Sequence, residues 1–276
     1  MDPKKKWTVW AMYFSATGTT AQVVRCVAHG LSAALDAPVR ELNFTPASER
    51  KTPPAFTESD LVVCGLPTYA GRLPNLLLPY LKSVQGGGAW AIPVVLYGNR
   101  NYDDSLIELR DILQADGFYT LAAGAFVGQH AFSDTLAAGR PNEEDLALAD
   151  ELACRAAEKL LEGARPGEPV AVRGQSPLRP YYQPRDRAGA PIDIRKVKPK
   201  VGEGCTKCGW CALVCPMDAI NPADVREVPG VCIKCNACVK GCPEHARYFD
   251  DAGYLYHRDE LEAQYGGARN MPELFL

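Results

Sequence analysis

The residues best suited to chemistry in this 276-residue sequence are eight of its 11 cysteines, which lie between positions 205 and 242. They form two runs of identical spacing, C-x2-C-x2-C-x3-C-P. Disulfide frameworks belong mostly to small secreted domains, so metal ligation in a compartment that keeps thiols reduced explains this spacing better. The other three, Cys26, Cys64 and Cys154, stand in apolar contexts and are expected to be small core residues.

The two runs have the spacing of iron–sulfur ligands. Three thiolates on one tight loop can reach three corners of a [4Fe–4S] cube, and in the bacterial ferredoxin signature the fourth cysteine of each run binds the other cluster. Zinc, the alternative, usually takes paired C-x2-C units separated by a loop. The segment closely resembles the two-cluster ferredoxins. The expected ligand sets are Cys205, Cys208, Cys211 and Cys242 for one cluster, and Cys232, Cys235, Cys238 and Cys215 for the other.

A second candidate site follows the first predicted strand. Hydroxyl side chains, a flexible glycine and the free amides of a predicted helix N-terminus favour a phosphate group there. The loop has no lysine and no Walker A pattern, so a phosphate ester fits better than a nucleoside triphosphate with magnesium. An ordinary Ser/Thr helix cap is the alternative. The loop residues are Ser15, Ala16, Thr17, Gly18, Thr19 and Thr20.

Two further loops follow the third and fourth predicted strands. In an open parallel sheet such loops meet beyond the carboxyl ends of the strands, at the switch point where ligands bind. Their aromatic and glycine residues suit a flat ring that is flanked by tyrosine faces and approached by backbone amides. The candidates are Pro67, Thr68, Tyr69, Ala70 and Gly71 in one loop, and Tyr97, Gly98, Asn99, Tyr102 and Asp103 in the other.

Alternating elements position these loops. The patterns predict strands over 7–14, 39–44, 61–65, 92–97 and 121–127, and helices from residue 20 and over 74–84, 103–115 and 143–162. Strands that alternate with crossover helices predict a doubly wound parallel α/β sheet with right-handed connections and strand order 2-1-3-4-5. A small α+β domain with the cysteines follows.

The composition divides the chain into four segments. We expect a sheet domain over 1–163, a Pro- and Arg-rich connecting strap over 164–200, the cysteine domain over 201–250 and a C-terminal tail over 251–276 that docks at an unspecified place. A solvated linker is the alternative for 164–200, but Tyr181 and Tyr182 indicate a strap that packs along both domains. His130 follows the fifth strand and could approach the ligand site at the sheet edge or the cysteine domain, or make a structural hydrogen bond.

Charge and hydropathy exclude some function classes. A net charge of −3 and a pI near 5.9 disfavour nucleic acid as a partner. Residues 4–14 loosely imitate a signal peptide, but they lead directly into the Ser/Thr loop without a cleavage site. No apolar run reaches the roughly 18 residues needed to span a bilayer. We therefore expect a cytoplasmic protein that does not enter the membrane.

The pattern Ser15-x-Thr17-Gly18-x-Thr20 resembles the phosphate motif of flavodoxins, and residues 1–163 as a whole resemble that family. The resemblance implies FMN as cofactor, with Tyr69 over one face of the flavin ring. It also implies that the 98–104 loop flanks the other side, with Tyr97 or Tyr102 stacked on the ring and the amides of Gly98 and Asn99 at its edge.

The whole chain resembles the flavodoxin–ferredoxin fusion flavoproteins of anaerobic bacteria. That resemblance implies an electron-transfer protein that relays electrons between FMN, two [4Fe–4S] clusters and redox protein partners. Two other interpretations stay open: a reductase of a quinone, a nitro compound or oxygen, and a docking protein that has lost its flavin. The sequence leaves the oligomeric state unspecified.

Overall fold

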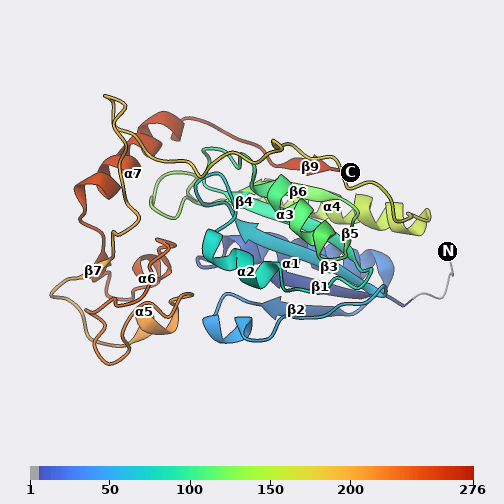
Figure 1. The fold of residues 1–276 in the computed structure, drawn as a ribbon, viewed down its shortest axis with the longest axis horizontal. Helices are drawn as coiled ribbons and strands as arrows, with labels where there is room; N and C mark the ends of the chain where they lie inside the picture. Colours follow the sequence, from blue (N-terminus) through green and yellow to red (C-terminus); the bar gives the residue numbers. More distant parts are fainter. Residues whose placement is uncertain (1–5) are drawn as a thin grey trace.

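The computed structural model describes residues 6–276, and a parallel sheet forms the centre of its larger part (Figure 1). The sheet runs in the order β2-β1-β3-β4-β6, which confirms the predicted order of five parallel strands. The strands are β1 (Thr8–Tyr13), β2 (Val39–Asn43), β3 (Asp60–Pro67), β4 (Trp90–Tyr97) and β6 (Ala123–Val127).

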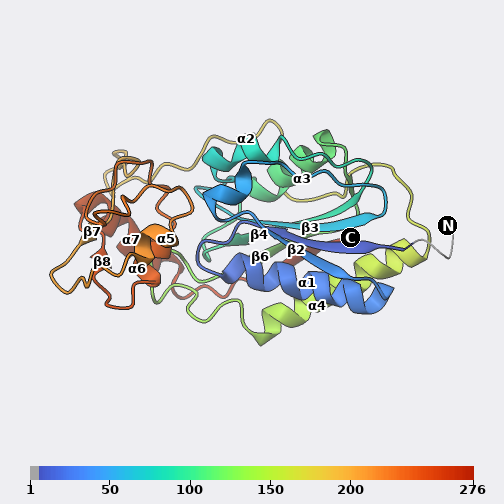
Figure 2. The ribbon, with the colours of Figure 1, turned by 90° about the horizontal axis from the view of Figure 1, so that it is seen from below.

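Helices cover both faces of this sheet (Figure 2). α1 (Thr19–Leu35) and α4 (Glu143–Leu161) lie together on one face, and α2 (Leu78–Leu81) and α3 (Ser105–Ala115) lie on the other. Because side chains alternate along a strand, β1 sends Val9 and Ala11 into the core under α1 and α4 and Met12 into the opposite core. The sheet is therefore buried on both sides, as parallel sheets are.

Two predicted elements differ in the structure. The helix predicted over 74–84 is wrong as one element: a 3-10 turn (η2, Asn75–Leu77) precedes the short α2, because Pro79 has no N–H for a continuous helical ladder. The fifth strand is split into β5 (Tyr119–Thr120) and β6, with Leu121 at the break. There the Leu121 carbonyl accepts a hydrogen bond from Lys159 Nζ at 2.6 Å. A second 3-10 turn, η1 (Ala47–Arg50), follows β2.

The cysteine domain lies beyond the carboxyl-terminal edge of the sheet (Figure 1). It contains two helical turns, α5 (Trp210–Leu213) and α6 (Ala237–Lys240), and a two-stranded antiparallel sheet of β7 (Lys200–Val201) and β8 (Arg247–Tyr248). This small α+β unit agrees with the fold predicted for the segment. The predicted domain boundaries stay predictions.

The tail after the cysteine domain returns to the large sheet. α7 (Ala252–Tyr265) packs near the cavity described below, and β9 (Glu273–Phe275) then pairs antiparallel with β6 (Figure 1). The sequence predicted docking of this tail but not its place. The chain therefore enters the cysteine domain and leaves it again, so two segments connect the domains.

The Pro- and Arg-rich segment lies along the surface of the sheet domain. The amide of Tyr182 donates to the Ala70 carbonyl at 2.8 Å, and the Tyr181 hydroxyl donates to the Leu73 carbonyl at 2.8 Å. Arg187 pairs with Glu260 on α7 at 2.7 Å. The segment thus contacts both the sheet domain and α7, as a strap would.

Among residues 6–276, no helix has the length and apolar character that crossing a membrane requires.

Candidate cofactor-binding sites

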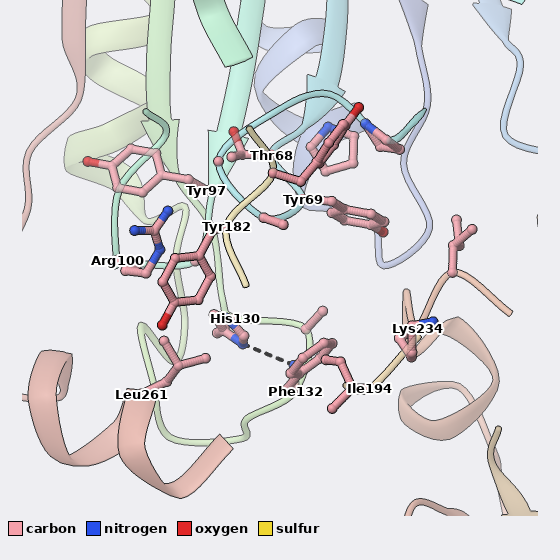
Figure 3. A pocket seen from close by; sticks show the side chains of 18 of the residues that line it. Thr68, Tyr69, Tyr97, Arg100, His130, Phe132, Tyr182, Ile194, Lys234 and Leu261 are labelled. Carbon is pink, nitrogen blue, oxygen red and sulfur yellow. Dashed lines mark hydrogen bonds between the residues drawn. The ribbon is translucent and has the colours of Figure 1, made fainter. Parts of the chain in front are cut away.

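A cavity of about 650 Å³ lies between the carboxyl ends of the strands and the cysteine domain (Figure 3). Its walls come from the loops after β1, β3, β4 and β6, from the strap, from the cysteine domain and from α7. This is the edge of the sheet where the switch point between β1 and β3 predicts a ligand. The volume lies in the range of small-molecule cofactor sites.

The phosphate loop forms one end of the cavity. Thr17, Thr19 and Thr20 line it, and Gly18 precedes α1 with a left-handed φ of 92°. The N-cap residue Gly18 has no side chain to cap the helix and the first turn has no acidic residue, so the first amides of this 17-residue helix, before Ala21, are available to an anion. Ser15 does not line the cavity; its Oγ accepts from the Ala21 amide at 3.0 Å and holds the loop against the helix.

The loop after β3 forms the wall nearest the cysteines. All five residues predicted there, Pro67 to Gly71, line the cavity. Tyr69 is open to the cavity but otherwise surrounded by protein, and this burial, with the charges of Cys235 and Cys232, raises its pKa well above the usual value. Its position fits the role implied for it, a ring on one face of a flat ligand.

The loop after β4 is used differently from what the resemblance implied. Tyr97 and Gly98 line the cavity, but Asn99, Tyr102 and Asp103 do not. The rings of Tyr97 and Tyr102 pack on each other with centroids 5.5 Å apart, and the Tyr102 hydroxyl donates to Glu273 on β9 at 3.0 Å. A flavin-stacking role of either tyrosine therefore stays a prediction that this arrangement does not favour.

The other two residues of that loop hold neighbouring segments. Asn99 Nδ2 donates to the carbonyls of Tyr265 and Ala268, at 2.9 and 2.8 Å, and ties the loop to the end of α7. The Asp103 carboxylate pairs with Arg100 and Arg179. The Asn99 bonds therefore attach the tail to the sheet domain, and the Asp103–Arg179 pair attaches the strap.

Several lining residues were not predicted as site residues. Five of them, labelled in Figure 3, are Tyr182, Arg100, His130, Phe132 and Lys234. Arg100 stacks over the Tyr182 ring at 4.6 Å from its centroid. The aromatic residues of the strap and the place of His130 after the fifth strand were the only signals in the sequence, because these residues meet only in the folded chain.

His130 has a structural role in this wall. Its Nδ1 accepts from the Phe132 amide at 3.1 Å, so this nitrogen carries no proton (Figure 3). Burial, together with the nearby charges of His257, Lys240 and Arg100, lowers the pKa of His130 to about 4. The imidazole is therefore neutral near pH 7 and supports the loop as a hydrogen-bond acceptor.

The eight cysteines line two small cavities in the cysteine domain. One is lined by Cys205, Cys208, Cys211 and Cys242, and the other by Cys215, Cys232, Cys235 and Cys238. Each cavity thus takes three cysteines from one run and the fourth from the other, which is the grouping expected from the signature. Among residues 6–276, no three His, Cys, Asp or Glu side chains form a group that could hold a metal ion; the thiols stand in fours around the two cavities instead.

Backbone amides point at the sulfurs in a repeated pattern. Lys207 N and Lys234 N donate to Cys205 Sγ and Cys232 Sγ, both at 3.4 Å. Ala219 N and Ala246 N donate to the Sγ of Cys215 and of Cys242, both at 3.3 Å. Amide hydrogen bonds to sulfur are a normal part of cluster sites. The donor sets and their surroundings therefore fit two [4Fe–4S] clusters.

The large cavity and one cysteine cavity share a wall. Cys232 and Ile233 line both of them. The set containing Cys232 is therefore next to the large cavity, whereas none of the four cysteines of the other set lines that cavity. Lys234, the next residue, lines the large cavity as well, and its ammonium donates to the carbonyls of Arg195 and Cys232 at 2.8 Å.

Comparisons with known proteins agree with this division. Residues 204–247 match the model of the 4Fe-4S dicluster domain. No curated protein matches the chain. Among solved structures, a flavodoxin from the domain Archaea is 16% identical with a TM-score of 0.40, and covers 56% of this chain and 99% of its own. A Streptococcus pneumonia flavodoxin is 20% identical with a TM-score of 0.38, covering 57% and 99%.

Larger proteins also appear among the similar structures. Rubredoxin oxygen:oxidoreductase from Desulfovibrio gigas is 19% identical with a TM-score of 0.40, over 58% of this chain and 37% of that one. Similarity at this level establishes no function. The sheet has the flavodoxin-like strand order. The chain thus combines a flavodoxin-like fold with a segment that matches the 4Fe-4S dicluster domain model.

Proposed function

We propose that this protein is an electron-transfer flavoprotein that binds FMN in the 650 Å³ cavity and two [4Fe–4S] clusters in the cysteine domain, and that it exchanges electrons with redox protein partners. Bound FMN exchanges one or two electrons, whereas each cluster exchanges one. The rest of the proposal concerns what the side chains do for these groups.

The observation that carries the proposal is the shared wall at Cys232 and Ile233. It supports an arrangement in which the set of Cys215, Cys232, Cys235 and Cys238 is proximal to the flavin, and the set of Cys205, Cys208, Cys211 and Cys242 is distal. In the distal set Cys208 is exposed, which suits exchange with an external protein.

The side chains around the cavity hold and shield the flavin. The first amides of α1 and the hydroxyls of Thr17 and Thr19 bind the phosphate. Tyr69 covers the flavin ring on the side of the cysteines. Tyr182, which belongs to the strap, and Phe132, which belongs to the 128–137 loop, limit the access of water to the ring. The two connections between the domains hold the flavin cavity next to the proximal cysteine set, so electron transfer between the cofactors need not await diffusion.

The first test is the cofactor content of anaerobically purified protein. About one FMN and about eight iron per chain are expected. Iron without flavin would refute the role of the large cavity, and flavin with zinc in place of iron would refute the role of the cysteines.

The second test measures internal exchange. After partial flash reduction of the holoprotein, the absorbance of the two cofactor types is followed to equilibrium at several protein concentrations. A rate that does not depend on concentration is expected. A rate proportional to concentration would mean that exchange occurs between molecules and would contradict the proposal.

A further inference from the structure

A buried arginine with unused hydrogen-bond donors lies in the cysteine domain. Arg247 on β8 is 3% exposed, and its Nη1 donates to the Val225 carbonyl. Its Nε and Nη2 are buried and have no hydrogen-bond partner among residues 6–276. Charged groups at this depth normally have an anionic partner, because burial without one is costly.

The internal repeat makes this arginine unusual. The cysteines of the two runs occupy equivalent positions at a constant interval in the sequence. The equivalence continues through Ala219 and Ala246, whose amides each donate a hydrogen bond to a cysteine sulfur. The next equivalent pair is Ile220 and Arg247. Both are buried, Ile220 at 4% and Arg247 at 3% exposure. One position in the repeat is therefore apolar in the first half and cationic in the second.

The surroundings identify the missing partner. Arg247 lines the cavity of Cys205, Cys208, Cys211 and Cys242, whereas Ile220 lines the other cysteine cavity. The guanidinium therefore lies beside the four cysteines of the first set, whose thiolates would supply the negative charge that its free donors lack.

We propose that Arg247 is a built-in counter-charge for the iron–sulfur cluster of the Cys205, Cys208, Cys211 and Cys242 set and makes that cluster easier to reduce; this inference rests on the proposed function. Four thiolates around a [4Fe–4S] core carry net negative charge, which increases by one on reduction. A fixed cation in a buried site stabilises the more negative form. Because its repeat counterpart is Ile220, the effect is unequal in the two halves.

The test compares three variants of the full chain, purified anaerobically. Arg247→Met removes the charge, Arg247→Lys keeps it, and Arg226→Met removes a charge from an exposed position of the same domain. Iron content and the two cluster potentials are measured, the latter by titration followed by electron paramagnetic resonance. In Arg247→Met, reduction of at least one cluster should become about tenfold less favourable, or about 59 mV for one electron. Arg247→Lys and Arg226→Met should shift less.

Each other outcome also decides the question. Loss of iron from Arg247→Met but not from Arg247→Lys would support the counter-charge, since the thiolates would then need a cation to hold their clusters. Equal shifts in the two Arg247 variants, loss of iron from both, or unchanged potentials in a fully loaded Arg247→Met would overturn it. Those results leave the proposed function intact, whereas wild-type protein without iron would overturn both.

Discussion

Asp104 offers a direct test of how the strap is attached. Its carboxylate is fully buried and accepts from the amides of Gln175 and Arg179 at 3.0 and 2.7 Å. The Arg179 guanidinium lies 3.5 Å from the same carboxylate. Asp104 directly precedes α3 in the sheet domain, so these bonds attach the strap to the scaffold just before Tyr182 enters the cavity wall.

The expected cost of Asp104→Ala follows from these bonds. Hydrogen bonds to a charged group contribute about 1.5–3 kcal/mol each, so losing two should cost about 3–6 kcal/mol of strap attachment. Since about 1.4 kcal/mol corresponds to a factor of ten in an equilibrium constant, the population of molecules with a detached strap should increase about a hundredfold or more. Hydrogen exchange at the Tyr182 amide and trypsin cleavage after Arg173 should both accelerate, and flavin retention should weaken by about tenfold or more.

Two further variants complete the experiment. Asp104→Asn keeps an acceptor and should fall between the wild type and Asp104→Ala. Glu158→Ala removes an exposed carboxylate from α4 that pairs with Arg155 on the same helix, and should leave the strap unchanged. Unchanged exchange at Tyr182 in Asp104→Ala would refute this account of strap attachment.

Three other predictions concern packing and pH. In Gly98→Ala the new Cβ would lie 2.3 Å from His130 Cδ2, so a loss of about 1–3 kcal/mol is expected in thermal unfolding, and an unchanged midpoint would contradict the close approach. Leu274→Asp, on β9 against the core, should lower the midpoint through a loss of about 1–3 kcal/mol, whereas Leu276→Asp at an exposed position should change it little. The folded-state pKa of His130 is about 4, below the unfolded value of about 6.5, so stability is fully present above the unfolded value and declines as the pH falls toward 4. Between about pH 7 and about pH 5 this residue should cost about 2 kcal/mol, and His130→Gln should remove that part of the pH dependence; equal pH dependence in both proteins would show that the histidine does not titrate as described.

Local patterns predicted much of the fold. The alternating apolar strands, the stripe of Val23, Val27 and Leu31 on α1 and the end of α4 near Gly163 all lie where the periodicity places them. Two predictions from local patterns were wrong. Pro79 interrupts the helix predicted over 74–84, and the fifth strand is broken at Leu121, whose carbonyl accepts a hydrogen bond from Lys159. The place of β9 could not be predicted, because a three-residue strand is specified by its partner β6 and by few of its own residues.

By itself, the sequence predicted the grouping of the eight cysteines, a phosphate loop after the first strand and the order of the sheet, because each depends on residue types at fixed short spacings or on strand and helix periodicity. Only the tertiary structure decided which tyrosines line the cavity, that Cys232 and Ile233 form a wall shared by this cavity and one cysteine set, and that Arg247 is buried beside the other set with unpaired donors. The physical reason is distance along the chain. Contacts between segments a hundred residues apart depend on how domains pack, and packing selects side chains by the shape and charge of neighbours that no local pattern specifies.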